Sequence, residues 1–214
     1  MKTPFLTLLL ILCSLAGPLP AAETLRIVAL GDSLTAGYGL PQQAAFPVQL
    51  EAALRQQGHQ VRVDNAGVSG DTSFGGLSRL DWALADNPEL VIIELGANDA
   101  LRGLQPDQTR QNLDSILQRL GDKGITALLT GMKAPRNLGE PYYTSFDRIY
   151  PELAQKHGVA FYPFFLEGVA GEPGLNQTDG IHPTREGVSI IVERMLPLVR
   201  AIVEKLEKSK TAIR

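Results

Sequence analysis

Five short apolar runs rich in β-branched residues constrain the fold of this chain more than any other feature. They are LRIVAL from Leu25, VRVDNA from Val61, ELVIIEL from Glu89, ITALLT from Ile125 and VAFY from Val159. Strand and helix patterns alternate, and the strand runs are too continuously apolar to leave one face in water. We therefore predict an α/β fold, a single three-layer α/β/α domain whose parallel sheet has the order 2-1-3-4-5.

The segments between the runs carry helix signals of their own. Apolar residues recur every three to four positions over 46–57 and 106–121, and Gly58 is a predicted helix stop. Two later segments also show helical spacing, but each contains an internal proline, Pro151 or Pro197. We expect each proline to kink its helix or to open it locally.

The N-terminus has the layout of a secretory signal peptide. Lys2 precedes an apolar stretch over 5–15, which is too short to span a membrane comfortably. We expect residues 1–22 to form the signal peptide, 23–205 to form the folded domain and the charged tail 206–214 to fray. An uncleaved N-terminal anchor is the alternative interpretation of the first segment.

Charge and cysteine content narrow the class of protein. The formal net charge is −3 and the sequence pI is about 5.6, so no basic face suited to nucleic acid is expected. The single cysteine, Cys13, lies in the predicted signal peptide and leaves the mature chain without a disulfide or a thiolate nucleophile. We expect a bacterial periplasmic or secreted monomer with no metal or cofactor and at most peripheral membrane contact.

Four loops that follow strands carry the polar residues of interest. They begin GDSLTAGYG at Gly31, GVSGDTS at Gly67 and GANDALRG at Gly96, and the last contains NQTDGIHPT from Asn176. In an open parallel sheet, ligands bind beyond the carboxyl ends of the strands. All four loops are therefore expected on one rim of the sheet.

Each loop supplies a group that acyl transfer can use. Ser33 places a hydroxyl at a helix entrance, but a serine needs an adjacent base to become a nucleophile. His182 is the candidate base, and Asp179 can fold back to orient its imidazole. The backbone N–H groups of Ser33 and Gly70, with the side-chain amide of Asn98, can form a three-donor oxyanion hole.

Each of these residues also has an ordinary structural interpretation. Ser33 and Asn98 could be helix caps, and Gly70 could be a turn residue. The histidines His59 and His157 stand at predicted helix ends, where a histidine interacts with the helix dipole or faces solvent. Only the third histidine lies on the rim, and the common location of the four loops favours the catalytic interpretation.

The four motifs together resemble the conserved blocks of the SGNH, or GDSL, hydrolase family. GDSL, GVSGDTS, GAND and DGIHP occur in the family's order and at similar spacing over the whole mature chain. Within that family the chain resembles exported esterases of the thioesterase, lysophospholipase and arylesterase type. The resemblance implies a flavodoxin-like sheet, Ser33 as nucleophile, His182 as base, Asp179 as its partner, and an oxyanion hole made by Ser33, Gly70 and Asn98.

Two residues and two loops lead to further expectations. Ala97 stands where many relatives have a second glycine, and its methyl group could restrict the backbone beside Asn98. Asp32 is expected to brace its turn by hydrogen bonding rather than to join the triad. The loops 132–143 and 163–177 are expected as lids around an acyl pocket, although their aromatic residues could instead pack over the sheet edge.

The predicted activity is hydrolysis of carboxylic esters through an acyl-enzyme. Because an exported protein meets few coenzyme A thioesters, oxygen esters such as lysophospholipids and aryl or alkyl esters are the expected substrates, with thioester cleavage an in vitro capacity. One alternative is a carbohydrate O-acetylesterase with the same chemistry. Another is a non-catalytic module with a flavodoxin-like fold that binds phosphate or flavin.

Overall fold

Five parallel strands form one sheet in the computed structural model, which describes residues 24–212. The spatial order is β2-β1-β3-β4-β5, and every neighbouring pair is parallel. The predicted fold class and strand order are thus confirmed. The predicted signal peptide, residues 1–22, lies outside the described residues. The strands are β1 (Leu25–Gly31), β2 (Val61–Gly67), β3 (Leu90–Glu94), β4 (Thr126–Thr130) and β5 (Ala160–Tyr162).

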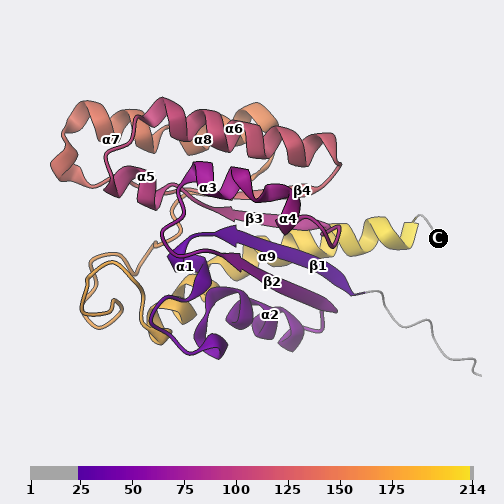
Figure 1. Cartoon of the computed structure of the whole chain (residues 1–214). Coiled ribbons are helices and arrows are strands. Elements are labelled where there is room, and N and C mark those ends of the chain that lie inside the picture. Colours follow the sequence, from indigo (N-terminus) through magenta and orange to yellow (C-terminus); the bar gives the residue numbers. More distant parts are fainter. Residues whose placement is uncertain (1–23, 213–214) are drawn as a thin grey trace, which may run out of the picture.

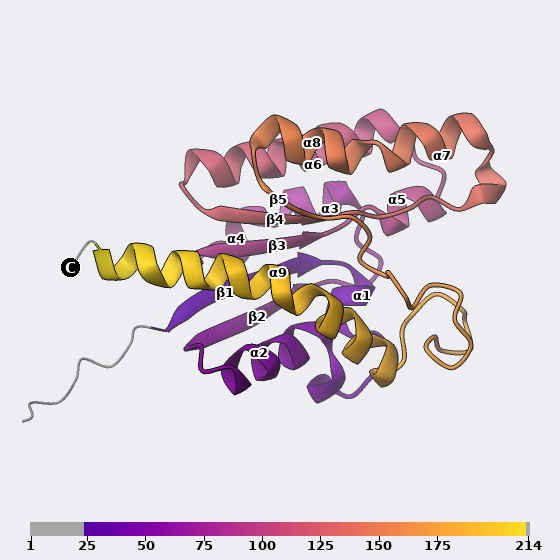
Figure 2. The same ribbon diagram turned by 180° about the vertical axis from the view of Figure 1, so that it is seen from behind.

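Helices cover both faces of the sheet, as Figures 1 and 2 show from opposite sides. One face carries α2 (Phe46–Gln56) and α9 (Arg185–Ala212). The other face carries α3 (Ser73–Ser78), α4 (Leu80–Ala83), α6 (Pro106–Asp122) and α8 (Ile149–His157). The remaining helical segments are α1 (Ser33–Ala36), η1 (Gln42–Ala44), α5 (Ala97–Leu101), η2 (Arg136–Leu138) and α7 (Glu140–Asp147).

The central strands form the core, and the edge strands are partly exposed. All five residues of β3 are buried, and so are nearly all residues of β1. At one edge, β2 exposes Arg62 and Asn65, while β5 at the other edge is only half-buried. The expectation that no strand has a wet face was therefore wrong for the edge strands, whose side chains are covered less completely than those of the central strands.

The two internal prolines differ in their effect on the helices. The segment 143–158 is divided between α7 and α8, which meet at Arg148. Pro151 falls in the first turn of α8, where a missing backbone N–H costs little. Around Pro197, α9 continues as one helix, so of the two expected effects, a kink or a local opening, the opening does not occur there. By contrast, α2 and α6 match the predicted helices to within one residue at each end.

The charged tail is helical rather than frayed as far as Ala212. Val203 is fully buried near the start of this segment, and Leu206 packs against the core. Farther along, Glu207 lies 3.1 Å from Nδ1 of His59, and Lys210 pairs with Glu89. These contacts to the rest of the domain stabilise the last turns of α9. They could not be predicted from the composition of the tail alone.

Gly67 sets how closely α1 can approach β2. A Cβ atom at this position would lie 2.3 Å from the backbone nitrogen of Ala36 and 2.9 Å from the carbonyl oxygen of Asp32. We expect Gly67→Ala to lower the free energy of unfolding by about 1–3 kcal/mol, because backbone atoms must shift to admit the methyl group. Urea denaturation measures this change. The control is Gly121→Ala, where a Cβ meets nothing within 4 Å; an equal loss in both variants would contradict the explanation.

Candidate active site

Ser33 begins α1 directly behind the carboxyl end of β1. The N-cap of this short helix is Asp32, whose Oδ1 accepts a hydrogen bond of 3.0 Å from the backbone N–H of Leu34. The expectation that Asp32 braces the turn is confirmed. Since Asp32 makes the cap, the hydroxyl of Ser33 is not needed for capping and is available for other contacts.

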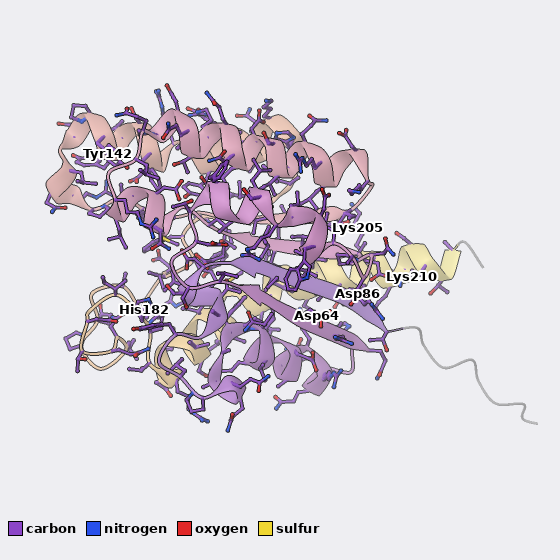
Figure 3. The ribbon with its side chains drawn as sticks, in the orientation of Figure 1. Asp64, Asp86, Tyr142, His182, Lys205 and Lys210 are labelled. Atoms are coloured by element: carbon purple, nitrogen blue, oxygen red, sulfur yellow. The ribbon has the colours of Figure 1, made fainter. Side chains whose placement is uncertain are left out.

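The hydroxyl of Ser33 instead contacts a histidine 149 residues later in the chain. Ser33 Oγ lies 2.8 Å from Nε2 of His182, and Nδ1 of the same ring lies 2.7 Å from Oδ2 of Asp179. Figure 3 shows His182 on the loop before α9, at the same end of the sheet as α1. The structure thus brings together the three residues predicted for the triad.

The carboxylate of Asp179 is held in its ionised form. Its Oδ1 accepts hydrogen bonds from the backbone N–H groups of His182, at 3.0 Å, and Ile181, at 2.9 Å. These two bonds, followed by the bond to the imidazole, lower the pKa of Asp179 to about 2. A permanent negative charge therefore stands beside Nδ1 of His182 and favours the tautomer that leaves Nε2 free to accept the serine proton.

Hydrogen bonds from Gln177 and a ring contact with Tyr38 hold the loop that carries His182. Gln177 donates from its backbone N–H to the carbonyl of His182 at 2.7 Å, and from its side chain to the carbonyls of Tyr38 and Pro183. The ring of Tyr38 lies 4.5 Å from the imidazole ring, centroid to centroid. Gln177 and Tyr38 were not among the predicted site residues, because nothing in their sequence neighbourhood indicates contact with the histidine.

The two backbone N–H groups predicted for the oxyanion hole are uncommitted. Within residues 24–212, neither the N–H of Ser33 nor that of Gly70 donates to an acceptor. Gly70 has φ of +86°, a conformation that favours glycine, and its carbonyl accepts a hydrogen bond of 2.8 Å from Arg102. This bond from Arg102 orients the Gly70–Asp71 peptide, which follows the Ser69–Gly70 peptide that carries the N–H of Gly70.

The side-chain amide of Asn98 is close to the site but already bonded. Its Nδ2 donates to the backbone carbonyl of Asp71 at 2.9 Å and to Oδ2 of Asp32 at 3.0 Å. An amide nitrogen carries two hydrogens, so both are in use before substrate arrives. Ala97 is the first residue of α5, and the positive φ needed before the helix, +111°, is adopted by Gly96.

A second carboxyl group is buried behind Asp32. Glu94, at the end of β3, is 1% exposed, and Asp32 is 0% exposed. Burial raises the pKa of Asp32 to about 6 and holds the pKa of Glu94 well above its usual range. Glu94 was overlooked in the sequence, although a charged residue within the apolar run ELVIIEL is the signal that could have identified it.

An apolar cavity of about 170 Å³ opens beside the serine and histidine. Met132, Lys133 and Pro135 of the first predicted lid and Leu166 of the second contribute to its wall. Phe165 of the second loop is instead fully buried and packs against Phe46. Part of each loop therefore lines the cavity, whereas Phe165 of the second loop packs in the core. The other lining residues are Asp32, Ser33, Leu34, Ala97, Asn98, Leu101, Ile181 and His182.

The other two histidines belong to surface contacts away from this rim. His59 pairs with Glu207, and Nε2 of His157 lies 2.5 Å from Asp114. Between residues 24 and 212, no cluster of three or more His, Cys, Asp or Glu side chains could hold a metal ion. The same part of the chain contains no helix that is long and apolar enough to cross a membrane.

Comparison with known proteins decides the family. The model of the GDSL-like lipase/acylhydrolase family matches residues 29–190, which includes all four motif loops. The chain belongs to this family. As a GDSL-like acylhydrolase it is a serine ester hydrolase. Its five-stranded parallel sheet is the flavodoxin-like sheet that the family resemblance implied.

Several relatives of this GDSL-like hydrolase match over almost their whole length. It is 43% identical to Esterase TesA of Pseudomonas aeruginosa over 86% of this chain and 90% of the relative. It is 42% identical to Thioesterase 1/protease 1/lysophospholipase L1 of Escherichia coli, over 94% and 92%. The crystal structure of AlinE4, an SGNH-hydrolase family esterase, is similar with a TM-score of 0.71 and 49% identity, covering 84% of this chain and 97% of that one.

Proposed function

We propose that Ser33, His182 and Asp179 form the catalytic triad of this hydrolase. As Ser33 Oγ attacks the ester carbonyl, Nε2 of His182 takes its proton, and Asp179 stabilises the resulting imidazolium. The alcohol leaves with that proton, and a water activated by the same imidazole then releases the acid from the acyl-enzyme. The observation that carries this proposal is the continuous path of 2.8 and 2.7 Å contacts from Ser33 Oγ to Asp179.

The oxyanion hole uses the backbone N–H groups of Ser33 and Gly70 and the amide of Asn98. The first two are uncommitted among the described residues and stand ready before substrate binds. Asn98 must exchange or share one of its two present bonds in order to donate to the oxyanion. A single donor of this kind contributes about 2.7–4 kcal/mol to stabilisation of the transition state.

The proposed substrates are acyl esters with an apolar acyl chain, including lysophospholipids and aryl or alkyl esters, with thioesters cleaved in vitro. Apolar side chains of Leu101, Met132 and Leu166 line the cavity beside the serine, and acyl chains gain binding energy from such contacts. The names of the relatives, which include a lysophospholipase and a thioesterase, are consistent with this substrate class.

A series of p-nitrophenyl esters from acetyl to palmitoyl tests the substrate proposal. We expect kcat/KM to rise from acetyl to a longer chain, because each buried methylene contributes up to about 0.8 kcal/mol. A matched measurement on Leu166→Ala should lower kcat/KM for the longer esters more than for the acetyl ester. A maximum at acetyl that persists in the variant would favour the O-acetylesterase alternative instead.

Fluorophosphonate labelling separates a hydrolase from a non-catalytic binding module. The reagent should modify the wild-type protein at Ser33 with a stoichiometry near one, and peptide mass spectrometry locates the adduct. His182→Ala, which keeps the hydroxyl and removes its proposed base, should be labelled far more slowly. Equal labelling rates in the two proteins would contradict the assigned role of His182.

We also propose a periplasmic or secreted location and a monomeric state. The apolar N-terminal segment and the absence of cysteine after Cys13 support the first proposal. Fractionation of a bacterial host, with N-terminal sequencing of the mature protein, tests the location. Analytical ultracentrifugation tests the oligomeric state.

A further inference from the structure

Arg79 is a largely buried cation that the ester-hydrolysis mechanism leaves unused. It is the residue between α3 and α4, and its side chain is 18% exposed. The apolar cavity beside the serine is lined by other residues, so the place of Arg79 in the fold is not explained by contact with an acyl chain. Its hydrogen bonds lead instead to two of the loops that follow strands.

Two nitrogens of the Arg79 guanidinium bind different segments of the chain. Nε donates to Oδ2 of Asp71 at 2.6 Å, and Nη2 donates to the backbone carbonyl of Gly31 at 2.9 Å. An arginine presents its N–H groups as a rigid planar fork, so two bonds from one guanidinium fix the two acceptors relative to each other. Arg79 therefore joins the end of β1 to the loop that follows β2.

The bond to Gly31 helps to position the turn that presents Ser33. The carbonyl of Gly31 accepts a second hydrogen bond, of 3.0 Å, from the backbone N–H of Val68. The N–H of the same peptide group belongs to Asp32 and donates to Oε2 of Glu94 at 3.3 Å. The next peptide group along the chain carries the N–H of Ser33, which is one proposed oxyanion donor. Hydrogen bonds at both ends of one peptide group thus restrain the group that follows it.

The bond to Asp71 reaches the other two proposed donors. Asp71 directly follows Gly70, and its backbone N–H donates to the carbonyl of Val68 at 3.0 Å. The carbonyl of Asp71 accepts the 2.9 Å bond from Nδ2 of Asn98, while its carboxylate accepts the bond from Arg79. A shift of Asp71 would therefore move both the peptide beside Gly70 and the acceptor that orients the Asn98 amide.

Stability alone explains this arginine poorly. Its third nitrogen, Nη1, is buried and has no hydrogen-bond partner within residues 24–212. A buried donor without a partner costs free energy, and a largely buried ion pair often adds little net stability. Both bonds that the guanidinium does make lead to segments that carry proposed oxyanion donors. The geometry thus favours a role in the site.

We propose that Arg79 is a positioning residue of this hydrolase: its guanidinium fork holds Gly31 and Asp71 at a fixed separation and so keeps the three oxyanion donors in place. The inference rests on the proposed triad and oxyanion hole. Arg79 acts on the reaction only through those donors. Because the oxyanion forms in the transition state, loss of the fork should lower kcat and leave KM nearly unchanged.

Two substitutions measure the contribution of the fork. Arg79→Met has no donor and should lower kcat for a p-nitrophenyl ester about 10- to 100-fold. Arg79→Lys keeps a positive charge beside Asp71, which favours folding, but an ammonium group does not reproduce the planar fork, and kcat should fall about 3- to 30-fold. Each rate is divided by the amount of Ser33 that fluorophosphonate labels at completion, so that unfolded protein does not count.

Arg62 offers a matched control. Its Nε lies 2.7 Å from Oδ1 of Asp64, an ion pair much like that of Arg79, but it stands near the start of β2, away from the rim. Arg62→Met should keep the wild-type kcat. Urea denaturation of all variants shows how much stability each one loses.

Affinity for a transition-state analogue separates positioning from a merely structural role. The boron of phenylboronic acid binds the oxygen of Ser33 as the serine proton passes to His182, and the tetrahedral adduct places a negatively charged group where the oxyanion would form. In Arg79→Met the inhibition constant should rise by the same factor as kcat/KM falls. A loss of folded protein alone would change the amount of active enzyme but not this constant.

A double-mutant cycle with Asn98→Ala tests the path through Asp71. If Arg79 acts through the oxyanion hole, Arg79→Met should lower kcat by a smaller factor in the Asn98→Ala background than in the wild-type background, because one of the positioned groups is already missing. Equal factors in the two backgrounds would contradict the proposed path.

Three further outcomes would overturn the inference. They are a wild-type kcat per reactive serine in Arg79→Met, a wild-type kcat in Arg79→Lys, and an inhibition constant for phenylboronic acid that stays constant while kcat falls. Failure of the proposed triad is distinguishable from all of these, because wild-type protein would then show no fluorophosphonate labelling at Ser33.

Discussion

Replacing Ser33 by alanine is expected to lower kcat for a p-nitrophenyl ester by about 10⁴- to 10⁶-fold. The hydroxyl is the group placed 2.8 Å from the base His182, and within the described residues no other serine hydroxyl contacts this histidine. The measurement is steady-state hydrolysis by protein whose folding is verified by circular dichroism and urea denaturation. The free energy of unfolding should change little, since the cap of α1 is made by Asp32.

Ser209 offers a matched control for that experiment. Its hydroxyl donates to the carbonyl of Lys205 within α9, far from the rim, so Ser209→Ala should keep full activity. Turnover by folded Ser33→Ala near that of Ser209→Ala would show that the nucleophile lies elsewhere. Residual activity should also fail to be titrated by fluorophosphonate, because the modified atom is absent.

Asp179→Asn is expected to lower kcat by about 10³- to 10⁴-fold while the protein remains folded. In the wild-type protein the Asp179 carboxylate accepts a hydrogen bond of 2.7 Å from Nδ1 of His182. The amide of an asparagine at this position can present an N–H donor to Nδ1 instead. A donor there stabilises the wrong tautomer and gives no charge to balance the imidazolium. Steady-state kinetics with a short ester measure the loss, which should appear in kcat more than in KM.

The lowered pKa of Asp179 also predicts how the activity loss in Asp179→Asn depends on pH. Because the pKa of Asp179 is lowered to about 2, the carboxylate stays ionised as the pH falls through 4, and its protonation cannot produce an acid limb in that range. The Asp179→Asn variant should consequently be impaired by a similar factor at every pH above about 4. An impairment that disappears at low pH would mean that Asp179 titrates with a normal pKa.

Much of the fold was predictable because it depends on local patterns. The strands β1 and β3 are apolar apart from Arg26 and Glu94, and nearly continuous apolar strands of this kind must be covered on both faces. Right-handed crossovers then leave few ways to connect them. The error at the charged tail occurred where tertiary contacts override a local signal: residues beyond Val203 remain helical because they contact the body of the domain.

The sequence by itself determined which residues would meet. Ser33 and His182 follow different parallel strands, and the carboxyl ends of parallel strands share one edge, so their proximity did not depend on details of packing. Asp179 is three residues from His182, and one turn of chain suffices to join them. Topology and short spacing were enough for these contacts.

Only the tertiary structure decided the state of each polar group. Glu94 and Asp32 are 62 residues apart, and nothing in either segment indicates that the Glu94 carboxyl accepts a hydrogen bond from the backbone N–H of Asp32. Likewise, the amide of Asn98 was predicted as a donor, but the structure alone shows that both of its hydrogens are already bonded. The physical reason is that protonation and hydrogen bonding depend on burial and on neighbours brought together by folding, whereas strand order depends on patterns carried within each segment.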